Sequence, residues 1–136
     1  MNAVLDASVW VARLVRQDAF HEPIKRWMET RRAAGDLFYA PDLLLAETSS
    51  AIRRRLDDAV LAARAVEVLI HLPALYLVEM DRELMVNASK LAAELGLRGA
   101  DATYAALAQR LNLPLVTLDV DQRERAAKRI PIADID

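Results

Sequence analysis

Short apolar runs alternate with longer amphipathic stretches along this chain. Four runs predict buried strands, at about 4–5, 37–40, 75–78 and 115–118. Each run is continuously apolar instead of alternating with polar residues, which is typical of strands that are covered on both faces. A last edge strand is expected at 130–132, because Pro131 is tolerated at the edge of a sheet.

The segments between these runs predict helices. Helical spacing or composition marks residues 8–16, 23–34, 42–56, 57–71, 82–95, 101–111 and 123–128. Pro23 suits a first helical turn, while Gly35 and Gly96 suit positions that end helices. Strands separated by helices predict parallel βαβ units, and therefore a three-layer α/β/α sandwich with a short, mainly parallel sheet.

Composition narrows the class of protein. The chain has 136 residues, 54% of them apolar, so we expect one folded domain over 1–136, since domains typically hold roughly 100–200 residues. Cysteine is absent, which excludes disulfides and thiolate metal sites. No apolar run approaches the roughly 20 residues of a membrane span, and no signal peptide is recognisable. We therefore expect a cytoplasmic protein that does not contact membranes.

Four carboxylates lie where the pattern predicts the edge of the core. Asp6 and Asp119 each end an apolar run, Glu47 interrupts the apolar face of a helix, and Asp101 opens an alanine-rich helix. Burying an ionised carboxylate is costly unless it is paired, hydrogen-bonded or bound to a metal. Because the carboxyl ends of parallel strands meet at one edge of a sheet, a shared acidic pocket is predicted there.

Each acid also has a simpler interpretation. Asp6 and Asp101 could cap the helices that follow them, Asp119 could be a turn residue, and Glu47 could pair with a buried arginine. Taken together, these interpretations require four coincidences at one edge of the sheet. Clustered carboxylates need a counter-ion, and Mg²⁺ or Mn²⁺ prefers oxygen ligands. Such a site favours phosphodiester hydrolysis without a serine or cysteine nucleophile and without an organic cofactor.

The residues around these acids resemble a known family. The segments concerned are Val4-Leu5-Asp6-Ala7-Ser8, Pro41-Asp42-Leu43 with Glu47, Arg98 to Ala108, and Leu113 to Asp119. In order and spacing they resemble a PIN-domain ribonuclease, most closely the VapC toxin branch of bacterial toxin–antitoxin pairs. The likeness covers nearly the whole chain. Each motif is weak alone, and the four together are fairly specific.

The resemblance implies a Mg²⁺- or Mn²⁺-dependent endoribonuclease that forms a homodimer and is inhibited by a cognate antitoxin. It implies that Asp6, Glu47, Asp101 and Asp119 are the four family acids, with Asp6 and Asp101 as the most direct metal ligands. Glu47 would complete the ligand shell or position the attacking water. Asp119 would bind or orient a second metal ion.

Four further residues are secondary candidates. Ser8 and Thr117 match small hydroxyl residues near the first and last acids of the family, and Asp121 could replace or assist Asp119. Arg98 lies just before Asp101 and is a candidate clamp for an RNA phosphate. The sequence does not rank Asp119 against Asp121.

Two alternatives stay open at this point. A PIN-like RNA-binding or scaffold module would keep the fold without cutting, although such a module should have lost some of the acids. A magnesium-dependent phosphatase would want a second aspartate two residues after Asp6, where Ser8 stands. Trp10 and Trp27 are expected to pack in the core or a dimer interface, and His21 and His71 share no metal-ligand spacing.

Overall fold

The structure is a computed structural model that describes residues 1–135. In chain order its elements are β1 (Ala3–Leu5), α1 (Ala7–Leu14), α2 (His21–Ala33), β2 (Phe38–Pro41), α3 (Leu43–Leu56), α4 (Ala59–His71), β3 (Leu75–Val78), α5 (Arg82–Leu95), α6 (Gly99–Leu111), β4 (Leu115–Val116) and α7 (Val120–Ala126). Within residues 1–135, no helix combines the length and apolarity that crossing a membrane requires.

The strands form one parallel sheet in the order β3-β2-β1-β4. Val4 of β1 lies opposite Tyr39 of β2 on one side and Leu115 of β4 on the other. The central position of β1 explains why its three residues are all buried. All three strand pairs are parallel, which confirms the predicted mainly parallel α/β architecture.

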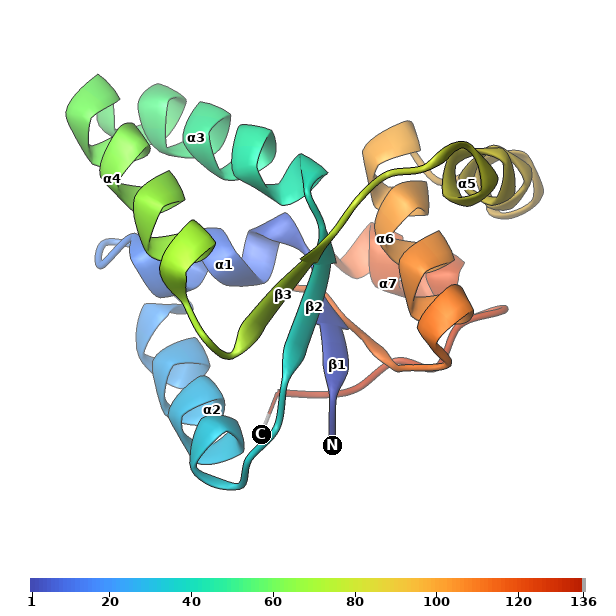
Figure 1. Ribbon diagram of the computed structural model, residues 1–136, viewed down its shortest axis with the longest axis horizontal. Helices are drawn as coiled ribbons and strands as arrows, with labels where there is room; N and C mark the ends of the chain where they lie inside the picture. The colour runs from blue at the N-terminus through green and yellow to red at the C-terminus, as the bar shows by residue number, and fades with distance from the viewer. Residues whose placement is uncertain (136) are drawn as a thin grey trace.

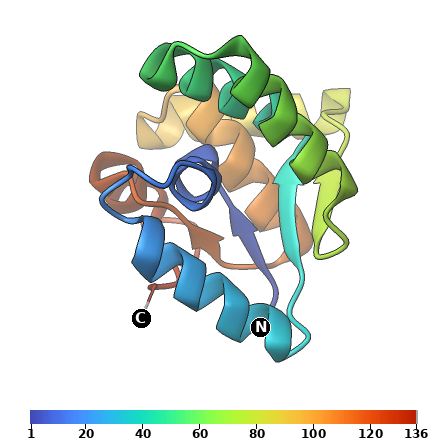
Figure 2. The same cartoon turned by 90° about the vertical axis from the view of Figure 1, so that its left-hand side faces the viewer.

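Helices cover both faces of this sheet. Figure 1 shows α1 to α4 gathered on one side of the strands and α5 and α6 on the other. Figure 2, which views the first side directly, shows α1, α2 and α4 in front of the strands. On the opposite face, α6 contacts β1, β2 and β4, while α5 packs against α6. The predicted three-layer sandwich is therefore confirmed.

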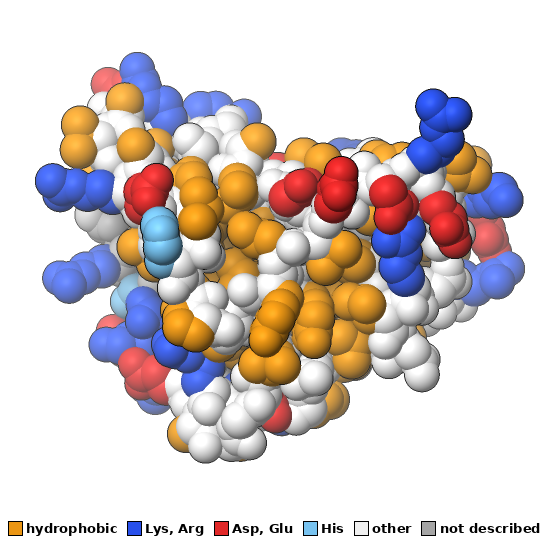
Figure 3. All heavy atoms as spheres, in the orientation of Figure 1, with side chains coloured by type: hydrophobic (Ala, Val, Ile, Leu, Met, Phe, Trp, Pro, Cys, Tyr) orange, Lys and Arg blue, Asp and Glu red, His pale blue; other side chains and the backbone are white. Residues whose placement is uncertain are grey.

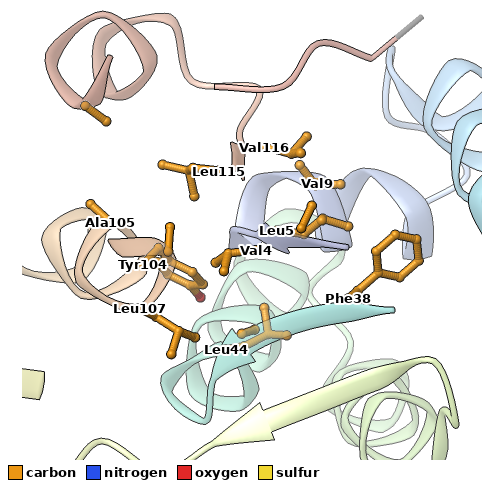
Figure 4. Close-up of a cluster of buried hydrophobic side chains, with 14 of the residues drawn as sticks. Val4, Leu5, Val9, Phe38, Leu44, Tyr104, Ala105, Leu107, Leu115 and Val116 are labelled. Carbon is orange, nitrogen blue, oxygen red and sulfur yellow. The ribbon is translucent and has the colours of Figure 1, made fainter. Parts of the chain in front are cut away.

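The core lies between these layers and contains most of the large apolar side chains. Figure 4 shows Val4 and Leu5 of β1 surrounded by side chains from the adjacent strands and helices. Phe38 of β2 is completely buried between two indole rings, with Trp10 edge-on and Trp27 stacked, each at 5.9 Å between ring centroids. Core packing, one of the two roles expected for the tryptophans, is the one observed.

Several predicted helix ends rest on the expected local chemistry. Asp58 caps α4 by accepting a hydrogen bond from the Leu61 N–H at 3.0 Å, and Asp81 caps α5 in the same way. Gly96 ends α5 with φ +71°, a left-handed conformation that glycine adopts without strain. The predicted bounds 82–95 of this helix are confirmed.

Other predicted bounds were wrong by a few residues. The fourth strand stops at Val116, since the Leu118 N–H donates to the Ser8 hydroxyl instead of continuing the sheet. Residues 130–132 contribute only a single parallel bridge, between Leu115 and Ile132. The sixth helix begins at Gly99, so Asp101 lies within its first turn and is not its cap.

Candidate active site

Asp6 links the central strand to the far end of the chain. It follows β1 and caps α1, with Oδ1 accepting hydrogen bonds from the backbone N–H groups of Ser8 and Val9 and from the Ser8 hydroxyl. Its second oxygen, Oδ2, accepts a 2.7 Å hydrogen bond from the Thr117 hydroxyl, just beyond β4. Helix capping therefore explains only one of its two oxygens.

Burial determines the protonation of Asp6. The side chain is enclosed, and this desolvation raises its pKa to about 6, while hydrogen bonds from Ser8, Thr117 and Val9 partly oppose the rise. The nearby carboxylate of Asp101 raises the pKa further. Folding thus holds an acid in a place where ionisation costs free energy unless a positive charge is supplied.

Glu47 points inward from the middle of α3. Its side chain is half-buried, and its Oε1 accepts a 2.6 Å hydrogen bond from the phenol of Tyr104 on α6. Figure 4 shows the Tyr104 ring reaching from α6 into the core cluster. Burial raises the Glu47 pKa, the tyrosine hydrogen bond lowers it, and the charge of Asp101 raises it again. The inward direction expected for Glu47 is observed.

Asp101 and Asp119 are joined by one arginine. The Arg98 Nε donates to Asp101 Oδ2 and its Nη2 donates to Asp119 Oδ2, both at 3.2 Å. Asp119 also caps α7, with its Oδ1 accepting from the Gln122 N–H at 3.0 Å. Burial is the main cause that raises the Asp101 pKa, and the Arg98 guanidinium opposes it.

Asp101 lies at the electrostatic centre of this group. Its charge raises the pKa of both Asp6 and Glu47, and the charge of Asp119 raises the pKa of Asp101 in turn. The four acids come from β1, α3, α6 and the β4–α7 junction, at the carboxyl-terminal edge of the sheet. Distant parts of the sequence therefore meet at one acidic site.

The donor set fits a hard divalent cation. It offers carboxylate and hydroxyl oxygens and no sulfur or imidazole, and three of its carboxyl groups have pKa values raised by burial and mutual repulsion. Within residues 1–135, no three His, Cys, Asp or Glu side chains are arranged to hold a metal ion as they stand. The site thus contains the oxygen ligands that a divalent cation prefers, but in the part of the chain that the structure describes its carboxylates do not surround a common point.

The secondary candidates fall into two groups. Ser8 and Thr117 lie beside Asp6, and their hydroxyl oxygens are 3.5 Å apart. Asp121 points elsewhere: its side chain is 73% exposed and accepts hydrogen bonds from Arg125 at 3.0 Å. Geometry therefore favours Asp119 over Asp121 as the fourth acid.

Two polar residues at the site were not anticipated. Tyr104 was missed, although it stands three residues after Asp101 and so shares its helical face, a usable signal. Buried Gln122 has its Oε1 3.0 Å from the Thr117 hydroxyl and its Nε2 without a hydrogen-bond partner. No sequence pattern indicated that Gln122 would be enclosed.

Replacing Asp6 is expected to stabilise the metal-free protein at neutral pH. The folded-state pKa of about 6 lies above the unfolded value of about 3.9. The folded state therefore binds the proton more tightly, and the free energy of unfolding falls as pH rises between these values. We expect Asp6→Asn to gain about 1–3 kcal/mol above this range and nothing below about pH 4.

Urea denaturation with chelator present, at about pH 4 and about pH 7.5, measures this difference. The exposed Asp121→Asn serves as the control and should show no comparable gain at the higher pH. An equal change for Asp6→Asn at both pH values would contradict the burial penalty.

Comparison with known proteins identifies the family. A family model described as the PIN domain matches residues 3–128. The chain therefore belongs to the PIN domain family, as the sequence motifs predicted. A search of curated protein sequences finds no match.

Solved structures share the fold at low sequence identity. The Mycobacterium tuberculosis toxin VapC20, described as cleaving the sarcin–ricin loop, is 18% identical, with a TM-score of 0.79 over 96% of this chain and 98% of that one. VapBC2 from Rickettsia felis, solved with a promoter DNA fragment, is 16% identical, with a TM-score of 0.75 and both chains fully covered. FitAcB from Neisseria gonorrhoeae is 20% identical, with a TM-score of 0.70 over 98% and 97% of the chains.

Proposed function

We propose that this protein is a metal-dependent endoribonuclease that hydrolyses RNA phosphodiester bonds and acts as the toxin of a toxin–antitoxin pair. The observation that carries the proposal is the convergence of Asp6, Glu47 and Asp119 on Asp101, each with hydrogen-bonded or charged partners. PIN family membership supports the same chemistry. A non-catalytic module would have little reason to hold Asp6, Glu47 and Asp101 under this electrostatic cost.

The proposed roles are those that the resemblance to PIN-domain ribonucleases implies. Asp6 and Asp101 are the most direct ligands for Mg²⁺ or Mn²⁺, Glu47 completes the shell or positions the attacking water, and Asp119 serves a second ion. When bound, such ions activate water and stabilise the leaving oxygen. The Ser8 and Thr117 hydroxyls hold the Asp6 carboxylate in one orientation.

The surface next to Asp119 offers room for substrate. A hollow of about 550 Å³ borders Asp119 and Thr117 and includes the exposed Phe20 and Arg123, whose guanidinium is ion-paired with Asp134 in the same hollow. Single-stranded RNA is commonly bound by a combination of aromatic stacking and positive charge. This hollow is the proposed path for nucleotides that flank the scissile phosphate.

Two exposed apolar surfaces are candidate interfaces for protein partners. One lies on α4 and includes Val60, Leu61 and Val68. The other lies at the β2–β3 edge, where Tyr39 and the half-exposed Tyr76 stack at 5.4 Å; Figure 3 shows hydrophobic side chains gathered near the centre of this face. Exposed apolar patches commonly mark interfaces. A homodimer and a cognate antitoxin in the cytoplasm are the proposed partners, in line with the toxin–antitoxin complexes of the same fold.

The function is tested by incubating purified protein with RNA in the presence of Mg²⁺ or Mn²⁺, and separately with EDTA. We expect cleavage only with the metal, because the acids otherwise repel one another and hold no water for attack. Restored cleavage after metal replacement controls for damage by the chelator. Cleavage that persists in EDTA would overturn the metal-dependent mechanism.

The RNA ends provide a second readout. A water nucleophile leaves no 2′,3′-cyclic phosphate, whereas attack by the ribose 2′-hydroxyl would. Neither histidine supports the second route: His21 is buried against the Ala12 carbonyl, and exposed His71 lies beside Glu67 on α4. Cyclic ends, or loss of cleavage when the 2′-hydroxyl is removed at the cut position, would point to a different mechanism.

A further inference from the structure

Arg98 spans the acidic site at a point where two separate elements meet. Its single guanidinium donates to Asp101 in the first turn of α6 and to Asp119 at the start of α7, each at 3.2 Å. Within residues 1–135, no other lysine or arginine is ion-paired with any of the four acids. Arg98 is therefore the cation that the site supplies for itself.

Arg98 pairs with oxygens of the same two acids that would hold a metal ion, and at Asp119 it takes the oxygen that is not used in capping α7. It engages one oxygen, Oδ2, of Asp101 and one oxygen, Oδ2, of Asp119. A divalent cation coordinated by these acids requires carboxylate lone pairs that face the site, and it repels a neighbouring guanidinium. Occupation by the metal and by the arginine is therefore mutually unfavourable.

We propose that Arg98 is a built-in competitor of the divalent cation, which holds Asp101 and Asp119 together in the metal-free protein and moves away when the metal binds. Because this role presupposes the metal site proposed above, its test has to separate the two. The Arg98 side chain can leave the site, since it is mostly exposed and is held there by its hydrogen bonds to Asp101 and Asp119.

Exposure sets the strength of the competition. The Arg98 side chain is 78% exposed, whereas those of Asp101 and Asp119 are 18% and 32% exposed. Solvent screens such an ion pair and weakens it. The arginine therefore lowers the affinity for the metal ion without preventing its binding. We expect Arg98→Ala to tighten Mn²⁺ binding by about two- to five-fold, within the range that an exposed ion pair allows.

Release would also free Arg98 for a second contact. At the rim of the site, a displaced guanidinium can pair with an RNA phosphate through its planar fork of donors. Arg98→Ala should therefore tighten metal binding and raise the KM for RNA at saturating metal. A residue with a merely structural role would not shift these two quantities in opposite directions.

The decisive measurement is Mn²⁺ binding to the full chain without RNA, followed by the electron paramagnetic resonance of free Mn²⁺ at fixed pH and ionic strength. Arg98→Ala should bind more tightly, and Arg98→Lys should lie between it and wild type, because a point charge cannot bridge both carboxylates as the fork does. Arg125→Ala is the matched control: it removes the same charge from a residue that pairs with Asp121 outside the site, and should change affinity less than about two-fold.

The variant Asp101→Asn distinguishes failure of the competitor role from failure of the proposed metal site. If it loses Mn²⁺ binding while Arg98→Ala binds like wild type or more weakly, the competitor role is wrong and the metal site stands. If Asp101→Asn binds Mn²⁺ as tightly as wild type, the proposed metal site is itself wrong. Circular dichroism of each variant establishes that the fold is intact.

Discussion

Asp101→Asn is expected to lower RNA cleavage by about 100- to 1000-fold, the loss typical of removing a principal electrostatic group from an active site. Asparagine keeps the shape of the side chain but removes the charge that acts on both Asp6 and Glu47. Because burial already disfavours the ionised form of Asp101, the neutral variant should fold at least as well as wild type. Catalysis and stability should therefore respond separately.

Single-turnover cleavage of one RNA by both proteins at equal Mn²⁺ measures the effect, with circular dichroism and urea denaturation to compare the folds. Asp42→Asn is a matched control, since Asp42 precedes α3 but makes no side-chain capping bond, and no hydrogen bond or ion pair joins it to the four acids in the described residues. Cleavage by Asp101→Asn at the wild-type rate would remove Asp101 from the site.

Phe38→Ala is expected to lower the free energy of unfolding by about 3–5 kcal/mol, the usual cost of removing a fully buried aromatic ring. Phe38 is inaccessible to solvent and touches both Trp10 and Trp27, so alanine would leave a cavity between two rigid indoles. Since small domains are stable by only about 5–15 kcal/mol, this loss should be severe.

Urea denaturation in one buffer provides the comparison. Phe20→Ala removes the same ring from a side chain that is 51% exposed, and its effect should stay within about 0.5–1 kcal/mol. Phe38→Leu keeps much of the volume and should cost less than alanine. Equal effects of Phe38→Ala and Phe20→Ala would show that the aromatic cluster does not stabilise the fold.

The core and the acidic site have opposite effects on the stability of the fold. The aromatic and aliphatic core stabilises the sheet, while the sheet edge holds acids whose ionisation opposes stability. Asp6 illustrates the conflict, because the enclosed position in which Ser8 and Thr117 bind its carboxylate also raises its pKa. Sites that bind charged ligands often reduce the stability of the free protein in this way.

Local pattern was sufficient for most of the fold. Continuous apolar runs indicated the parallel strands, and a glycine in the left-handed region ended α5 where predicted. Local pattern failed where a distant residue competed for a backbone group, as at Leu118, whose N–H bonds to Ser8 some 110 positions away. Such competition leaves no periodic signal.

In the candidate site, too, some residues could be predicted from the sequence and others could not. Residue type and spacing single out Asp6, Glu47, Asp101 and Asp119, since acids next to apolar runs are unusual. The phenol of Tyr104, the enclosed amide of Gln122 and the bridge made by Arg98 depend on the packing of helices that are far apart in sequence. Their partners could not be read from neighbouring residues.

The sequence by itself determined the α/β layers, the PIN family motifs and the four acids, because these depend on hydrophobic periodicity and on the cost of placing charge beside a core. Only the tertiary structure decided which oxygen faces which partner, that Asp119 rather than Asp121 turns inward, and that an arginine occupies the acids. Hydrogen bonds and ion pairs act over a few ångströms, so they are specified only once the chain has folded.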